Sequence, residues 1–390
     1  MVKKVPSVRF KGFSKEWEKR RLGDLTENFK SGMNIKAEYI YKTGDFPVYG
    51  GNDVRGYTDT YNHDGEFALI GRQGALSGNM NYSVGKAYFT EHAIAVKANK
   101  ENETKYLYYL MSKLRLERWV TQSAQPGLAV GTLKEIKSLV PNKDEQKKIS
   151  KFLTKLDDTI ELHQHALNLL KQRKKAFFQK MFPTEDEDVP SVRFKGYNEK
   201  WTSTTLGSIG KTFTGLSGKT KKDFGHGEAE FITYKNIFNN AIADTEGTEN
   251  VEIDAKQNEV HFGDALFTTS SETPEEVGMS SVWLDSRKNV YLNSFCFGFR
   301  PHSEIDQLFL AFFLRSPLVR RKIAILAQGI SRYNISKKKV MKLEVKIPSL
   351  KEQQKIGNFF KELDNSITLQ EEKIESLKQM KKAFLQKMFV

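Results

Sequence analysis

The sequence V-P-S-V-R-F-K-G-F-S-K-E-W at residues 5–17 returns as V-P-S-V-R-F-K-G-Y-N-E-K-W at residues 189–201, an offset of 184. A second repeated block, with the pattern P-x-x-x-E-Q-x-K-I, begins at Pro141 and again at Pro348, an offset of 207. The segment between the blocks is therefore 23 residues longer in the second copy, and there the copies barely resemble each other. A period of this length predicts two copies of one domain-plus-helix unit rather than a solenoid of short repeats.

The second repeated block is predicted to be a long helix in each copy. Apolar or long side chains recur in alternating steps of four and three residues from Ile149 to Met181 and from Ile356 to Met388. A helix of about 37 residues is ~55 Å long and cannot bury such a stripe alone. We expect the two helices to pair within the chain as an antiparallel coiled coil, and pairing between chains is the alternative.

Two polar residues interrupt the apolar stripes at matching places. His163 is midway between Ile149 and Phe177 of the first stripe, and Gln370 is midway between Ile356 and Phe384 of the second. An antiparallel pair would bring them face to face, and such a polar layer fixes the register at some cost in stability. The alternative is that each residue tolerates water at a loosely packed position.

The segments between the repeated blocks are predicted to be mixed α/β domains. Strand-like runs precede an amphipathic helical stretch in both, at 66–70, 86–96 and 104–120 in the first and at 265–269, 289–299 and 306–327 in the second. Ser316 before Pro317 reads as an N-cap and a first-turn proline that restart the last helix. The fold class predicted is α+β, with two pseudo-repeated mixed α/β domains joined by the two long helices. The divisions expected are an N-terminal conserved region (1–21), a first domain (22–141), a first helix (142–182), an acidic linker with the repeated entry segment (183–205), a second domain (206–348) and a second helix (349–390).

Composition indicates a folded chain with an anionic partner. The 390 residues are 38% hydrophobic and 12% aromatic, which is enough to build cores and excludes a disordered chain. The formal net charge is +14, but the helical blocks 143–182 and 350–389 carry +5 and +2 of it. Because the positive and negative charges of the two domain segments are almost balanced, contact of the domains with an anionic partner such as a nucleic acid requires cations clustered on one face.

The sequence predicts a cytoplasmic protein. Cys296 is the single cysteine, so no disulfide closes within the chain, and neither end has the basic-then-apolar layout of a signal peptide. The longest apolar run, Leu308 to Leu314, is far shorter than the ~20 residues that span a bilayer.

Motifs for catalysis or cofactor binding are not found. The sequence G-L-S-G-K-T at 215–220 has Phe213 where a phosphate-binding loop needs its first glycine, and no N-P-P-[FY] or D-P-P-[FY] tetrapeptide occurs. His163 and His165 fall on different helix faces, and Cys296 has no second cysteine to share a metal. His92 is interpreted as a core or rim histidine rather than a base. We therefore expect a chain that is non-catalytic and holds no cofactor or metal.

Polar and glycine-rich loops beside the predicted strands form the candidate DNA-binding surface. Arg, Gln and Asn make bidentate hydrogen bonds to guanine or adenine, whereas Lys, Ser, Thr and loop N–H groups hold phosphates. We predict Arg72 and Gln73 as base readers in the first domain and Arg332 with Tyr333 in the second. The other candidates are Asn52, Arg55, Tyr57, Asn79, Asn81 and Gln125 in the first and Lys219, Lys235, Asn236, Thr269, Ser270 and Asn334 in the second. For each, the alternative is a solvated loop residue, and Arg320, Arg321 and Lys322 are interpreted as phosphate contacts or a solvated helix face.

Two doubled motifs carry a family resemblance. They are V-P-x-x-R-F-x-G-[FY]-x-x-x-W, followed by Leu-Gly at 22–23 and 206–207, and E-Q-x-K-I-x-x-F-[LF]-x-x-L-D-x-x-I. With them, the whole chain resembles the specificity subunit of type I restriction–modification enzymes. The resemblance implies two target-recognition domains that each read half of a split double-stranded DNA site, and a coiled coil that sets their spacing. Since the two domain segments differ in sequence, the site is expected to be asymmetric.

The resemblance also implies the partners. Two modification subunits would methylate adenine N6 with S-adenosylmethionine, and restriction subunits would use ATP and Mg²⁺ for translocation and cleavage, so this chain would bind none of these cofactors. One alternative is a DNA-binding coiled-coil scaffold without methyltransferase partners, such as a repressor or an anti-restriction decoy. Another is an oligomeric structural protein, which predicts no protection of DNA.

Overall fold

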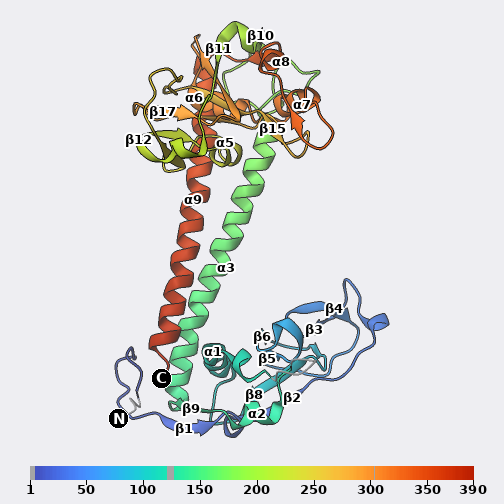
Figure 1. Cartoon of the computed structure of the whole chain (residues 1–390). Coiled ribbons are helices and arrows are strands. Elements are labelled where there is room, and N and C mark those ends of the chain that lie inside the picture. The colour runs from blue at the N-terminus through green and yellow to red at the C-terminus, as the bar shows by residue number, and fades with distance from the viewer. Residues whose placement is uncertain (1–4, 121–126, 303) are drawn as a thin grey trace. The chain divides into compact units, whose positions relative to one another are not determined.

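The computed structural model describes residues 5–120, 127–302 and 304–390, and its internal contacts divide the chain into two units (Figure 1). The first unit comprises Met1–His165 and Glu372–Val390, and the second comprises Ala166–Glu371. The C-terminal end of the chain thus belongs to the same unit as the N-terminal domain. Helices α3 (Lys143–Lys180) and α9 (Leu350–Lys387), of 38 residues each, contribute to both units.

The first unit is built on two small sheets. A four-stranded antiparallel sheet has the order β2 (Thr26–Ser31), β8 (Ala93–Ala98), β5 (Phe67–Gly71) and β6 (Met80–Ser83), and a three-stranded sheet has the order β4 (Val54–Thr58), β3 (Phe46–Tyr49) and β7 (Tyr88–Phe89). Helix α1 (Thr104–Leu114) packs over β5 and β6 (Figure 1). Strand β5 is buried along its whole length, so its continuous apolar run forms the centre of the core. Strands β1 (Glu18–Arg21) and β9 (Lys137–Val140), with helix α2 (Val130–Glu135), complete this unit.

The second unit repeats this topology despite its different sequence. Its four-stranded sheet has the order β11 (Gly210–Thr214), β18 (Cys296–Pro301), β14 (Ala265–Thr268) and β16 (Ser280–Val282), and its three-stranded sheet has the order β13 (Thr248–Val251), β12 (Phe224–Ile232) and β17 (Val290–Leu292). In both units the three-stranded sheet contains one antiparallel and one parallel pair. The remaining pairs are β10 (Thr202–Thr205) with β20 (Glu344–Ile347) and β15 (Ser270–Ser271) with β19 (Tyr333–Asn334). The predicted pseudo-repeat of two mixed α/β domains is therefore confirmed.

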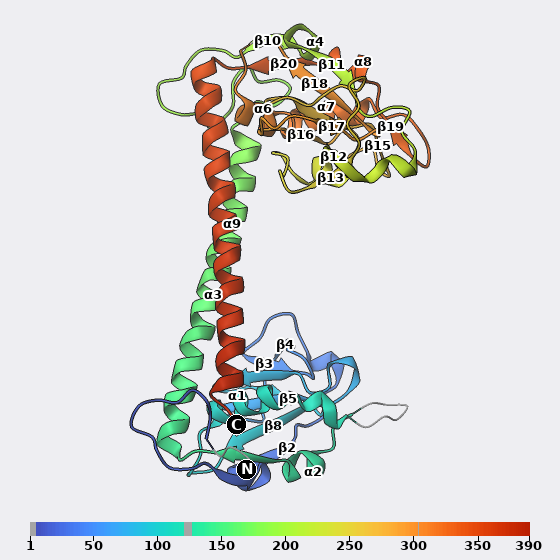
Figure 2. The same ribbon diagram turned by 60° about the vertical axis from the view of Figure 1, so that its left-hand side comes forward.

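Short helices cover the second unit's sheets. They are α4 (Leu206–Ile209), α5 (Tyr234–Asn239), α6 (Gln307–Phe313), α7 (Pro317–Ile325) and α8 (Lys337–Met341). Helix α6 packs on β16, as Figure 2 shows, and α5 packs on β14 and β16. Buried aromatic side chains fill this core, with Phe267, Phe299, Phe309 and Phe312 all nearly inaccessible.

One helix ends earlier than expected, and one predicted N-cap side chain makes no capping hydrogen bond. The stretch 104–120 is helical only to Leu114, because Arg115 adopts a left-handed conformation with φ 55°, and a 3-10 turn at Leu116–Trp119 follows. The stretch 306–327 divides at Pro317 as predicted, with Ser316 at the N-cap position. The Ser316 hydroxyl makes no hydrogen bond in the described part of the chain, so it does not supply the predicted side-chain cap.

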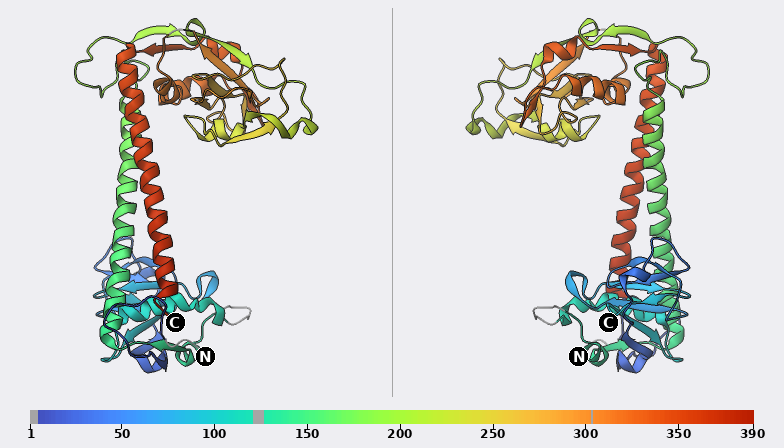
Figure 3. Two further views of the ribbon diagram at one scale, coloured as in Figure 1. Left: turned by 90° about the vertical axis from the view of Figure 1, so that its left-hand side faces the viewer. Right: turned by 90° about the vertical axis from the view of Figure 1, so that its right-hand side faces the viewer.

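Helices α3 and α9 pair antiparallel within each unit and lie side by side in Figures 2 and 3. In the first unit Phe152 contacts Phe384, with ring centroids 4.8 Å apart, and Asp157 pairs with Lys381. In the second unit Phe177 contacts Phe359 at 5.1 Å, and Lys174 pairs with Asp364. The numbers rise along α3 while they fall along α9, which confirms intramolecular antiparallel pairing. The polar layer of His163 and Gln370 would join residues of different units and stays a prediction.

Each copy of the repeat closes on the end of the other copy. Trp17 packs edge-on against Phe389, and the equivalent Trp201 packs edge-on against Phe182, both with ring centroids 6.5 Å apart. Backbone hydrogen bonds follow the same rule, from Val8 N to Lys387 O and from Val192 N to Lys180 O, both 3.0 Å. Each entry segment therefore anchors the last turn of the other copy's helix.

A buried ion pair joins the two repeated motifs inside each unit. The Arg9 guanidinium donates to both carboxylate oxygens of Glu145 at 2.7 and 2.8 Å, and Arg193 does the same to Glu352 at 2.6 and 2.7 Å. Both glutamate side chains are only 1% exposed. The most similar stretches of the two copies are thus the parts that bind each other, while the sheets carry the differences.

Candidate nucleic-acid interface

Three predicted residues of the first unit form one exposed amide cluster. The side-chain amides of Asn79 and Asn81 both donate to Asn52, which lies in the turn between β3 and β4. Asn79 and Asn81 precede and enter β6, so the cluster joins the two sheets at one edge. Arg55 and Tyr57 are exposed on neighbouring β4. The loops that carry these five candidates of the first domain therefore meet.

The predicted base readers Arg72 and Gln73 lie immediately after β5. Backbone hydrogen bonds fix Arg72, from its N–H to His92 O at 2.9 Å and from Leu128 N to its own carbonyl at 2.8 Å. Among the described residues its guanidinium has no hydrogen bond or ion pair, as a group that contacts DNA requires. Gln73 Oε1 lies 2.9 Å from His92 Nδ1, which makes His92 a rim residue that orients Gln73. The candidate Gln125 lies outside the described residues.

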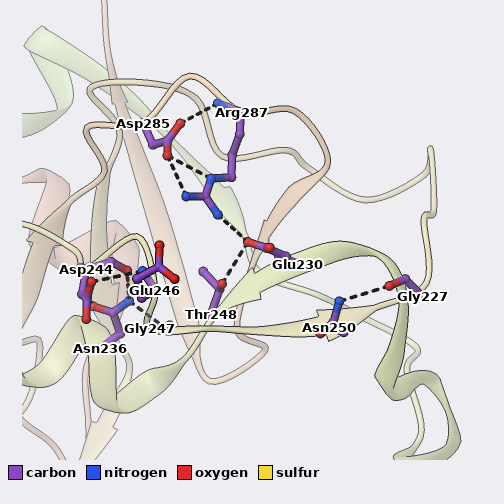
Figure 4. Close-up of polar contacts among 10 residues, drawn as sticks. All are labelled: Gly227, Glu230, Asn236, Asp244, Glu246, Gly247, Thr248, Asn250, Asp285 and Arg287. Carbon is purple, nitrogen blue, oxygen red and sulfur yellow. Dashed lines mark hydrogen bonds and ion pairs between the residues drawn. The ribbon is translucent and has the colours of Figure 1, made fainter.

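Two candidates in the second unit serve the fold instead. Asn236 is 5% exposed and donates to the carbonyls of Asp244 and Gly247 at 2.7 and 2.9 Å, while its Oδ1 accepts from Asp244 N at 2.8 Å (Figure 4). Lys219 pairs with Asp254 at 2.9 Å, and its hydrogen bond helps to lower the pKa of Asp254 to about 2. The structure contradicts the prediction that Asn236 contacts DNA, because both ends of its amide bind backbone groups of the fold. Lys219 is held by a structural partner.

A polar network around Glu230 fixes the three-stranded sheet of this unit. The Glu230 carboxylate accepts from Thr248 Oγ1 and from the Arg287 guanidinium, both at 2.9 Å (Figure 4). Arg287 also donates to Asp285, and these hydrogen bonds lower the pKa of the Asp285 carboxyl. The network ties β12 and β13 to the loop before β17.

Several second-unit candidates gather around a pocket of about 310 Å³. Its lining comes from α5, β15, the loop after β15 and the loop before β19, and comprises Tyr234, Lys235, Phe238, Ser270, Ser271, Glu272, Glu276 and Arg332. Tyr333 and Asn334 form β19 against β15, and Thr269 donates its hydroxyl to Phe295 O at 2.7 Å. The predicted residues Lys235, Ser270 and Arg332 are thus brought together. Ser270 takes part through its backbone, since it is 5% exposed and its carbonyl accepts from Tyr234 OH.

In the basic run on α7, Arg320 faces the protein, contrary to its interpretation as a phosphate contact or part of a solvated face, whereas Arg321 lies on a solvated face with its side chain 58% exposed. Arg320 donates to the carbonyls of Glu275, Val277 and Gly278, and burial lowers the pKa of its guanidinium to about 10. Arg321 pairs with Glu185 at 3.0 Å, and Lys322 donates to Glu344 O at 3.0 Å. These contacts tie α7 to its neighbouring loops, which the amino-acid types alone did not reveal.

Arg315 is a positioning residue that the sequence did not single out. It donates to the carbonyls of Ile237, Phe238 and Asn240 at 2.8–2.9 Å and to Ser280 O at 2.6 Å. Burial lowers the pKa of its guanidinium to about 10. It therefore holds the C-terminal end of α5, which lines the pocket. In the sequence, the position of Arg315 between two apolar helical segments is the feature that indicates a buried structural role.

Groups that could hold a metal or react covalently are sparse. Across residues 5–120, 127–302 and 304–390, no three His, Cys, Asp or Glu side chains are grouped as metal ligands. Cys296 is buried, and burial raises the pKa of its thiol. In the same part of the chain, no helix combines the length and apolar character needed to cross a membrane.

Comparison with known proteins places the chain in a family. The family described as "Type I restriction modification DNA specificity domain" matches residues 14–172 and 198–379. The chain is 38% identical over 154 residues to the type I restriction enzyme EcoprrI specificity subunit of Escherichia coli, a match covering 38% of each protein. It is 23% identical over 383 residues to a type I restriction enzyme specificity subunit of Haemophilus influenzae, covering 92% of this chain and 90% of that one.

A solved structure agrees with the fold. The S subunit of a type I restriction–modification system from M. genitalium superposes with a TM-score of 0.65 at 16% identity, over 99% of both chains. The two segments matched by the family fall on the two copies of the repeat and together make up most of the sequence. The chain therefore belongs to the type I restriction–modification DNA specificity family, whose members recognise DNA and leave catalysis to partner subunits.

Proposed function

We propose that this chain recognises a split, asymmetric DNA site, with one half-site read by the globular domain of each unit. One observation carries the proposal: the two units share the same fold but present different loop residues. Both units have the same strand order and the same buried Arg–Glu ion pair. The first unit presents an asparagine cluster beside Arg72, whereas the second presents a pocket lined by Arg332. Because the loop side chains of the two domains differ, the two domains should form hydrogen bonds with different base edges.

The same repeat supports two identical partners. Two pseudo-equivalent frames offer two equivalent docking surfaces, which suits two copies of one modification subunit. These would methylate adenine N6 with S-adenosylmethionine, and restriction subunits would add ATP- and Mg²⁺-dependent cleavage, while this chain contributes recognition and binds none of these cofactors. We place the assembly in the cytoplasm, where it meets DNA. A repressor or decoy without such partners is not favoured by the family relationship.

Genome-wide detection of N6-methyladenine tests this function. In a host that carries the chain with its modification subunits, we expect methylation at one motif made of two unlike halves separated by a fixed gap. Deleting only the gene for this chain is the matched control, and that motif is expected to lose its methylation completely. Methylation that persists after the deletion, or a motif without a gap, would contradict the proposal.

A further inference from the structure

The pocket in the second unit has an aromatic wall and a polar floor. The rings of Tyr234 and Phe238 stack with centroids 5.9 Å apart and an interplanar angle of 19°. The Tyr234 hydroxyl donates to Ser270 O at 2.6 Å, which joins α5 to β15. The wall is therefore fixed to the edge of the strand that forms the floor.

The other walls are held by buried donors and by backbone pairing. Arg315 binds the carbonyls at the end of α5, and Arg320 binds those of residues 275–278 in the loop that carries Glu272 and Glu276. The loop 328–334 closes as a hairpin, because Gln328 and Asn334 exchange two backbone hydrogen bonds of 2.9 and 2.8 Å. The pocket is thus preorganised, as readout of a base edge requires.

Two oppositely charged side chains line this pocket without binding each other. Arg332 and Glu272 are exposed, and neither side chain has a hydrogen bond or ion pair within the described ranges. Glu276 differs, because it accepts hydrogen bonds from Ser271 and Thr273 at 3.2 and 2.9 Å. One guanidinium fork and one carboxylate therefore stay available on a rigid frame.

These two groups match the major-groove edge of a single base pair. Guanine presents the acceptors O6 and N7, for which an arginine fork is the commonest specific partner, and cytosine presents an N4 amino donor, which suits a carboxylate. At an A·T pair, a guanidinium at adenine would meet the N6 amino donor and a carboxylate at thymine would meet the O4 acceptor. In the reversed pair the carboxylate could accept from adenine N6, but the arginine fork would find one acceptor, thymine O4, instead of the two that guanine offers. Lys235, on the pocket rim without a partner among the described residues, is placed for a phosphate contact.

We infer that this pocket reads one G·C base pair of the second domain's half-site, with Arg332 at guanine and Glu272 at cytosine. The inference rests on the proposed function and deepens it, because it names the base pair and the two side chains that specify it. Tyr234 and Phe238 are positioning residues that shape the pocket, and Arg315 and Arg320 hold its walls.

The test uses the full chain assembled with its modification subunits and maps the methylated motif of Arg332→Ala and Glu272→Ala. We expect both variants to relax the same single G·C position, with the preference for that pair falling about 10- to 100-fold. All other positions, including the whole of the other half-site, should be unchanged. Lys338→Ala is the matched control, since Lys338 is an exposed cation on α8 that does not line the pocket.

Three results would overturn the inference. One is a uniform loss of methylation with an unaltered motif in Arg332→Ala, which marks a phosphate contact. Another is relaxation by the two variants at different positions, and the third is no change in either variant. The unsubstituted assembly distinguishes failure of this inference from failure of the proposed function. If that assembly methylated no split motif, the proposed function itself would be refuted. Thermal unfolding of each variant should match the parent, as expected for exposed side chains.

Discussion

Replacing Phe389 by alanine is expected to destabilise the first unit by about 3–5 kcal/mol, the usual cost of emptying a buried phenylalanine site. Phe389 is 3% exposed, stacks on Tyr106 with ring centroids 5.4 Å apart and contacts Trp17. The matched variant Phe182→Ala removes the equivalent ring between Trp201 and Phe360 and should destabilise the second unit by a similar amount. Hydrogen exchange measured segment by segment assigns each loss to its unit.

The pattern of exchange decides whether each copy closes on the other. Phe389→Ala should raise exchange within residues 5–120 although it lies at the opposite end of the chain, and Phe182→Ala should leave those residues unaffected. Phe295→Ala is the control, because Phe295 is 61% exposed and its loss should cost no more than about 0.5 kcal/mol. If Phe389→Ala raised hydrogen exchange in the second unit, or left exchange in the first unit unchanged, the end of the second copy's helix would not stabilise the first unit.

Removing one partner of a buried Arg–Glu pair is the second large effect. Arg193→Ala leaves the carboxylate of Glu352, 1% exposed, without either of its guanidinium hydrogen bonds. An uncompensated buried charge costs about 3–5 kcal/mol, so the free energy of unfolding should fall by that amount, as measured by urea denaturation. Arg9→Ala is expected to do the same through Glu145 in the first unit.

A surface pair on the same chain provides the comparison. Arg21 and Glu135 lie 3.0 Å apart with side chains 51% and 65% exposed, so Arg21→Ala should change stability by less than about 1 kcal/mol. Replacing both members of a buried pair with apolar residues, as in Arg193→Met with Glu352→Leu, should recover much of the loss. Equal effects of Arg193→Ala and Arg21→Ala would show that the buried pair has no special role.

The features predicted best from the sequence are the two long helices, because a regular spacing of apolar residues determines them. The four-and-three spacing from Ile149 and from Ile356 predicted both long helices and their pairing, since a stripe of that length must be covered. The Arg9–Glu145 pair was missed although both residues stand in the quoted motifs, because 136 residues separate them and no period connects them. Arg115 could not be foreseen as a helix end, since arginine rarely adopts positive φ.

The residues of the candidate interface also divide into those that the sequence predicted correctly and those that it did not. Loop composition found Asn52, Asn79 and Asn81, which the fold then brought together. Asn236 and Arg320 were misread, because an amide or a guanidinium in a loop or on a helix face gives no sign of the backbone carbonyls it satisfies. The acidic side of the pocket was missed for a different reason. Loop composition points to cations, amides and hydroxyls as DNA contacts, and it gives no sign that a carboxylate such as Glu272 lines the same pocket.

Shortening both long helices tests most directly the claim that the domains read the half-sites and the helices set the gap. Removing the equivalent residues Ala166–Leu169 and Lys373–Ser376 takes out about one turn, or ~6 Å, of each helix. At ~3.4 Å per base pair, the methylated motif should keep both half-site sequences while its gap shortens by one or two base pairs. An unchanged gap, or altered half-site sequences with the original gap, would contradict the account.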